Sequence, residues 1–192
     1  MNKLNWFAIV ITAAVIIQAC GRNANTDDTS LVDSVTVVKN TPGHQRFEAE
    51  KVDADFIGEA IRFNRMGLEL GEIARRQGIH KRIKTFGMVL IADQSKLNKK
   101  IKALSLIKNI AVPAEPEASG SVILSQLSKK SGADFDRAYI SIINNEYKKE
   151  IPIFEAAEKN CADKDIKSFA MKTMPMLKAH LEAINAISYS MK

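Results

Sequence analysis

The stretch SGADFDRAYISIINNEYKKEIPIFEAAEKNC, residues 131–161, decides the fold class of this chain. Its apolar residues recur at intervals of three or four, which places them on one face of an α-helix. We call such a row a seam, and this seam consists of Ile140, Ile143, Tyr147, Ile151, Phe154, Ala157 and Cys161. The pattern predicts a long helix that begins after Gly132 with Asp134 as its N-cap.

Two prolines lie inside otherwise continuous helical patterns, Pro152 in this stretch and Pro175 further along the chain. A proline in a helix interior costs about 3 kcal/mol or more. The apolar period nevertheless resumes in phase after each of them. We therefore expect kinks in two long helices rather than breaks.

Three other segments repeat the same apolar spacing. The first begins at Asp53 or Asp55 as N-cap and ends at Gly78, the second covers about residues 80–109, and the last follows Asp163. Their seams are Phe56, Ala60, Phe63, Gly67, Leu70 and Ala74; Ile83, Phe86, Leu90, Gln94, Leu97, Ile101 and Leu104; and Ile166, Phe169, Thr173, Met176, His180, Ile184 and Ile187.

The connections between these helices indicate how they pack. The first two helices are joined tightly around Gly78, and the last two around residues 160–163. Roughly two dozen residues separate the second helix from the third, including VPAEPEASG and the short amphipathic piece SVILSQLSKK. A connection this long lets the second and third helices run parallel. We therefore expect an all-α fold over residues 52–192: a ferritin-like four-helix bundle with one long crossover between helices two and three.

Residues 1–19 have the features of a signal peptide. Lys3 gives a positive start, and the apolar run at residues 6–17 has the length of a signal core, too short to span a membrane. The run ends in Ile17-Gln18-Ala19-Cys20-Gly21, which resembles the lipobox of bacterial lipoproteins. We expect Cys20 to be acylated and to anchor the chain. The alternative is an ordinary secretory signal with an incidental cysteine.

Residues 20–51 are polar and carry no sustained period, so we expect a flexible tether behind the lipidated Cys20. A tether of about 30 residues spans roughly 30 Å. Gly21 is not the aspartate that, by resemblance to enteric bacteria, retains lipoproteins at the inner membrane. We therefore favour the outer membrane of the cell envelope, with the face of the membrane left open.

Cysteine usage and charge limit the kinds of partner that we expect for this chain. Lipidation of Cys20 leaves only Cys161, for which we expect a place in the core. The formal net charge of +6 comes from lysines scattered along the helices, without an aromatic platform or a nucleic-acid motif. We expect the membrane as a partner through the lipid anchor, together with an envelope protein or polymer, and no nucleic acid.

Each seam is interrupted near its middle, by Gly67, Gln94, Tyr147 and His180. Parallel second and third helices would place Gln94 and Tyr147 at nearly the same depth, so the four positions predict one buried polar layer. Unpaired buried polar groups cost about 1–3 kcal/mol each. Our hypothesis is that His180 is a neutral core residue, hydrogen-bonded beside Tyr147 and Gln94, and that Gly67 leaves room for the Tyr147 ring.

The same layer is a weak candidate for a metal site. Di-iron bundles use Glu-x-x-His motifs, and this chain has none. The nearest carboxylates to His180 by helical position are Glu69, Asp93 and Glu146, which we expect beside the seams on exposed surface. We predict no metal and no cofactor; a metal, if bound, would be held by His180 with these three carboxylates.

Four stretches carry a resemblance to a known family: LELGEIA, MVLIADQSKLNKKIKAL, SGADFDRAYISIINNEYKKEIPIFEAAEK and FAMKTMPMLKAHLEAI. Over residues 52–190 the chain resembles a bacterial ferritin-like family of unknown function, whose members are often described as membrane or outer-membrane proteins. The resemblance implies inward metal-binding groups at Gly67, Asp93-Gln94, Glu146-Tyr147 and His180. Three of these positions are altered here, and only His180 matches the family pattern.

Two functions follow as hypotheses. The first is a membrane-anchored protein of the cell envelope with a binding or structural role. The alternative, implied by the resemblance, is a ferritin-like metal-binding or oxidative-stress protein. We expect no enzyme, because the sequence contains neither G-x-S-x-G nor His-Glu-x-x-His.

Overall fold

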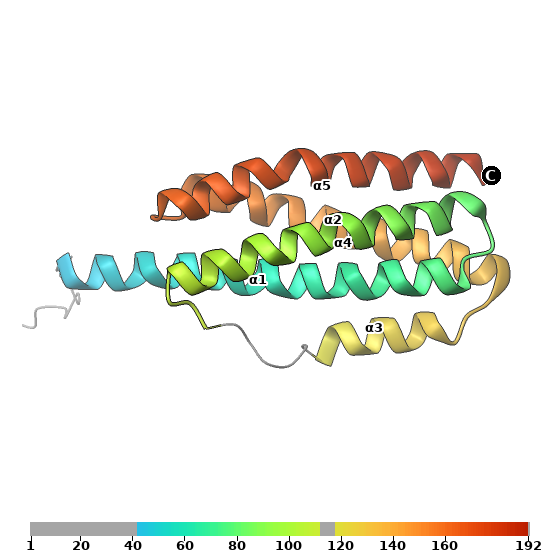
Figure 1. Cartoon of the computed structure of the whole chain (residues 1–192), viewed down its shortest axis with the longest axis horizontal. Helices are drawn as coiled ribbons and strands as arrows, with labels where there is room; N and C mark the ends of the chain where they lie inside the picture. Colours follow the sequence, from blue (N-terminus) through green and yellow to red (C-terminus); the bar gives the residue numbers. More distant parts are fainter. Residues whose placement is uncertain (1–41, 112–117, 192) are drawn as a thin grey trace, which may run out of the picture. The chain divides into compact units, whose positions relative to one another are not determined.

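The computed structural model describes the backbone of residues 42–111 and 118–191, and the side chains of residues 48–111 and 122–191. These parts of the chain contain helices joined by turns and no strand, which confirms the all-α prediction for them (Figure 1). The expected signal peptide, Cys20 and residues 20–41 of the expected tether lie outside the described residues. The helices are α1 (Pro42–Gln77), α2 (Lys81–Ile107), α3 (Ala118–Ser128), α4 (Gly132–Asn160) and α5 (Lys164–Ser190).

The four long helices pack as two hairpins. α1 lies against α2, and α4 lies against α5; α1 also contacts α4, and α2 also contacts α5. Figure 1 shows α2, in green, and α4, in orange, running in the same direction. The connection between them contains α3, which contacts α1 and α4 and is a helix in its own right rather than only a short amphipathic piece.

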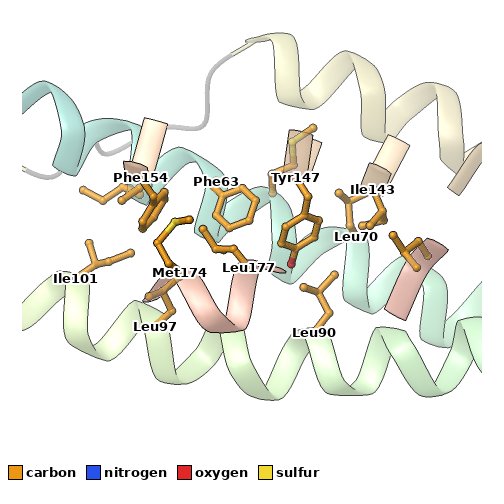
Figure 2. Packing of buried hydrophobic residues seen from close by; sticks show 14 of the residues in the cluster. Phe63, Leu70, Leu90, Leu97, Ile101, Ile143, Tyr147, Phe154, Met174 and Leu177 are labelled. Carbon is orange, nitrogen blue, oxygen red and sulfur yellow. The ribbon is translucent and has the colours of Figure 1, made fainter. Parts of the chain in front are cut away.

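The seams lie inside this assembly. Most of their residues are buried, while Leu104, Ile151 and Met176 are partly exposed. Figure 2 shows the labelled core residues of several helices meeting between the ribbons, with Phe63, Leu90 and Leu177 around Tyr147. Pro152 and Pro175 both lie inside continuous helices, so neither proline breaks its helix.

The expected start of the first helix was wrong. α1 begins at Pro42, so residues 42–51 of the expected tether are helical. Proline suits the first turn of a helix, because its φ is already helical and its missing N–H would have no partner there. Asp53 does not cap α1; it is buried, and its carboxylate accepts hydrogen bonds from the backbone N–H groups of Ala162 at 2.8 Å and Asp163 at 3.0 Å.

The expected cap of α4 was also wrong. Its N-cap is Ser131, and Asp134 lies in the exposed first turn, where it pairs with Arg137. Asp136 is the buried carboxylate of this region, and it accepts hydrogen bonds from the backbone N–H groups of Ile79 at 3.1 Å and His80 at 2.9 Å. Each hairpin therefore contributes one aspartate, Asp53 or Asp136, that binds the turn of the other hairpin.

α5 begins as expected, with Asp163 as its N-cap. Its side chain accepts hydrogen bonds from the N–H groups of Asp165 at 2.8 Å and Ile166 at 3.1 Å. No helix in the described part of the chain is both long and apolar enough to cross a membrane.

We predict that Asp136→Ala lowers the free energy of unfolding by about 2–3 kcal/mol, because two turn N–H groups lose a charged acceptor. Asp134→Ala is the matched control, since it removes an exposed carboxylate from the same helix and is expected to cost at most about 0.5 kcal/mol. Urea denaturation of both variants measures the difference. Equal losses would show that the bond between hairpins contributes nothing specific.

Candidate functional site

Tyr147 of α4 and His180 of α5 form the centre of the polar layer. Both side chains are buried, and the Tyr147 hydroxyl lies 2.7 Å from His180 Nδ1. On the other side of the ring, His180 Nε2 lies 3.1 Å from Asp93 Oδ2. An ionised carboxylate only accepts hydrogen bonds, so Nε2 carries the proton and Nδ1 of the neutral ring accepts from the tyrosine hydroxyl.

Burial sets the protonation of this chain of hydrogen bonds. It lowers the pKa of His180, and the hydrogen bond with Asp93 only partly opposes that shift. Burial likewise raises the pKa of Tyr147, so the phenol keeps its proton. Burial would raise the pKa of Asp93, but hydrogen bonds with Lys96 and His180 outweigh it and lower this pKa. The result is a chain of hydrogen bonds that runs from neutral Tyr147 through neutral His180 to the partly exposed carboxylate of Asp93.

Aromatic rings enclose the pair. The ring of Phe63 packs edge-on against Tyr147 with centroids 5.3 Å apart, and Phe86 packs against His180 at 5.8 Å. These contacts fix the orientation of both polar rings and exclude water from the Tyr147 side.

Gln94 of α2 is fully buried beside Gly67 of α1. A Cβ placed on Gly67 would lie 2.7 Å from Gln94 Nε2, so the glycine makes room for the glutamine side chain. Gly67 and Tyr147 also line one small cavity, and our expectation that Gly67 leaves room for the Tyr147 ring stays a prediction. The Gln94 Nε2 atom has no hydrogen-bond partner among the described residues.

Sequence reasoning missed Asn64, which is buried one turn before Gly67. Its Nδ2 donates to the backbone oxygen of Gln94 at 2.6 Å and to Gln94 Oε1 at 2.9 Å. The signal that could have found it is the spacing of three residues from Gly67, which places both on one helix face. The two hairpins thus each carry one polar pair, Asn64–Gln94 and Tyr147–His180.

Sequence reasoning also missed a partly buried ion-pair cluster between α1 and α4. The Arg62 guanidinium pairs with Glu59 at 2.8 Å, Glu146 at 3.7 Å and Glu150, whose side chain is fully buried. Lys149 adds a second cation, 3.2 Å from Glu146. Burial raises the pKa of Glu150 to about 7 although Arg62 opposes the shift. Glu150 therefore exchanges a proton near neutral pH.

The carboxylates that could have joined His180 do not gather around it. Asp93 contacts His180, but Glu69 is exposed and Glu146 pairs with Arg62 and Lys149. Our expectation of an exposed position was wrong for Glu146, which is buried because it forms these ion pairs.

The residues of the layer do not fit the metal centre that a ferritin-like resemblance implies. Both nitrogens of His180 are already hydrogen-bonded, and Gly67 offers no side chain. Within the described residues, no group of three or more His, Cys, Asp or Glu side chains is placed to hold a metal ion. The chemistry available to the layer is hydrogen bonding between Tyr147, His180 and Asp93.

Cys161 lies in the core at the end of α4, as its seam position indicates. Burial raises the pKa of its thiol to about 12, so the thiol stays protonated at neutral pH. Cys161 is therefore a packing residue of the core.

Comparison with known proteins shows the family of this chain. The model of a family described as a domain of unknown function, DUF4142, matches residues 39–187 of the chain. No curated protein and no solved structure matches.

We predict that Gly67→Ala destabilises the protein by about 1–3 kcal/mol, because the new methyl group displaces the Gln94 side chain. The double variant Gly67→Ala with Gln94→Ala removes the clash and is expected to lose less than the two single losses added together. Thermal and urea unfolding of the four proteins in this cycle measure the coupling. Additive losses would contradict the contact between the two positions.

We predict that Glu150 makes the protein less stable as pH rises. The folded state holds a proton on Glu150 up to about pH 7, whereas the unfolded chain loses it near the ordinary pKa of 4.5. Between pH 5 and pH 8 the free energy of unfolding should therefore fall by about 1–3 kcal/mol more in the native protein than in Glu150→Gln. The exposed Glu158→Gln of the same helix should keep the native pH slope. Equal slopes in the native protein and Glu150→Gln would refute the raised pKa.

Proposed function

The chain belongs to the family of domains of unknown function DUF4142, and we propose that it is a lipid-anchored binding protein of the cell envelope. We propose further that α1, α2, α4 and α5 form a ferritin-like four-helix bundle, with α3 in the crossover. The packing of α1 on α2 and of α4 on α5, and the shared direction of α2 and α4, support this arrangement (Figure 1).

The sequence that ends at Cys20 is the observation that supports the proposed lipid anchor. A positive residue, an apolar run at residues 6–17 and a small residue precede the cysteine in the order of a lipobox. A polar segment follows before α1 begins at Pro42. Such a segment holds a domain close to a membrane while leaving its surface free for partners. We place the protein at the outer membrane, with an envelope protein, polymer or small ligand as its partner rather than nucleic acid.

The geometry of the polar layer supports a binding or structural role over a catalytic one. The Tyr147 phenol keeps its proton, and the His180 ring has a partner at each nitrogen, so neither group is prepared to act on a substrate. Because both nitrogens of His180 are already hydrogen-bonded, we rank the metal-binding or oxidative-stress role second. Elemental analysis of protein purified without chelators separates the two roles, because a metal in stoichiometric amount would favour the second.

We predict that the protein takes up a clickable palmitate analogue in a bacterial host and that Cys20→Ser does not. The thiol of Cys20 is the proposed acylation site, so its removal abolishes the label. Cys161→Ser is the matched control, because it removes the other cysteine of the chain and should keep the label. In-gel fluorescence of membrane and soluble fractions provides the measurement. An unlabelled native protein, or label retained in Cys20→Ser, would refute the anchor.

A further inference from the structure

An apolar groove with a volume of about 650 Å³ runs along the surface between α2 and α5. Its walls include Phe86 and Val89 of α2 and Ala183, Ala186 and Ile187 of α5. Val89 is 44 % exposed, and the two alanines are exposed as well. The small alanine side chains leave the hollow open, so apolar surface faces solvent where a larger residue would have filled the space.

One end of the groove is positively charged. Lys81 and Arg82, in the first turn of α2, line it, and no carboxylate lines it anywhere. Within the part of the chain whose side chains are described, neither cation forms an ion pair. Asp136 binds the α1–α2 turn beside this end, but it is buried and both its oxygens accept from the backbone of that turn. The two cations are thus available to an anion from outside.

The groove is short and open to solvent. Lys81 and Val89 lie about 12 Å apart along α2, at the helical rise of 1.5 Å per residue. A second copy of the chain would need roughly 800 Å² of contact on each partner for a stable dimer, which a trough of this length between two helices does not offer. A single acyl chain matches the apolar floor, and one anionic group matches the cationic end.

We propose that this groove binds a fatty acid, with its carboxylate at Lys81 and Arg82 and its acyl chain between Phe86 and Val89 on one side and Ala183 and Ala186 on the other. The proposal names the ligand class of the binding role proposed above and rests on that role. It does not require the lipid anchor.

The test uses residues 20–192 with Cys20→Ser, which contain every described helix and need no detergent. Isothermal titration with dodecanoate, below its micellar concentration, should give binding to one site. Lys81→Glu with Arg82→Glu should weaken it by about tenfold or more, through loss of two cations and gain of two like charges. Lys99→Glu with Lys100→Glu makes the same charge change at exposed positions of α2 outside the groove and should leave the affinity within about twofold.

Two further measurements test the apolar part. Ala183→Trp fills the groove and should abolish binding, whereas Ala103→Trp, at an exposed position of α2 outside the groove, should not. Dodecanol, which has the same chain without the charge, should bind about tenfold more weakly and should not respond to the charge reversal. A circular dichroism melting curve of each variant checks that it is folded at the temperature at which its affinity is measured.

Four outcomes would overturn the proposal. They are no binding of dodecanoate to the folded protein, equal binding of dodecanoate and dodecanol, unchanged affinity in Ala183→Trp, and a dimer in light scattering that only Ala183→Trp dissociates. The last would assign the groove to a second copy. Failure of dodecanoate binding while Cys20-dependent labelling persists would remove this inference alone and leave the anchored protein intact.

Discussion

Polar groups that lie among long helices need partners inside the protein, and this requirement determines how the two hairpins are joined. Asp53 of α1 binds the α4–α5 turn, and Asp136 of α4 binds the α1–α2 turn. Each aspartate precedes a polar core residue by eleven positions, Asn64 in one helix and Tyr147 in the other. Eleven residues make about three helical turns, so the aspartate and the core residue share a face. The same physical solution therefore occurs once in each hairpin, with a carboxylate that binds the opposite turn and a hydrogen-bonded pair in the middle.

The polar layer lies in the interior between the two hairpins, and its side chains bond to one another there. Asn64 holds Gln94 within one hairpin, Tyr147 holds His180 within the other, and Asp93 connects His180 to the surface. Because each of these bonds uses the atoms that a metal would need, the layer joins helices instead of presenting open ligand positions. The groove that we propose as a ligand site lies outside this layer, on the surface between α2 and α5.

Periodicity in the sequence was sufficient to predict the four long helices, although not the start of α1, because an apolar stripe is a property of one segment alone. Residues such as Phe56, Leu90 and Ile143 are buried where their spacing places them. Polar residues beside the stripe were not predictable, since their role depends on a different helix. Glu146 is buried because Arg62 of α1 reaches it, and no pattern within α4 records that contact.

His180 is a neutral member of this layer with a hydrogen bond at each ring nitrogen, and nitrogen-15 NMR of its imidazole ring can measure both properties. We predict a single tautomer with the proton on Nε2, an unprotonated Nδ1, and a ring whose pKa lies below the ordinary histidine value of about 6.5. Tyr147→Phe should shift the Nδ1 resonance while leaving the helices folded. A ring that is already an imidazolium at pH 6.5, or one that exchanges between tautomers, would contradict the claim.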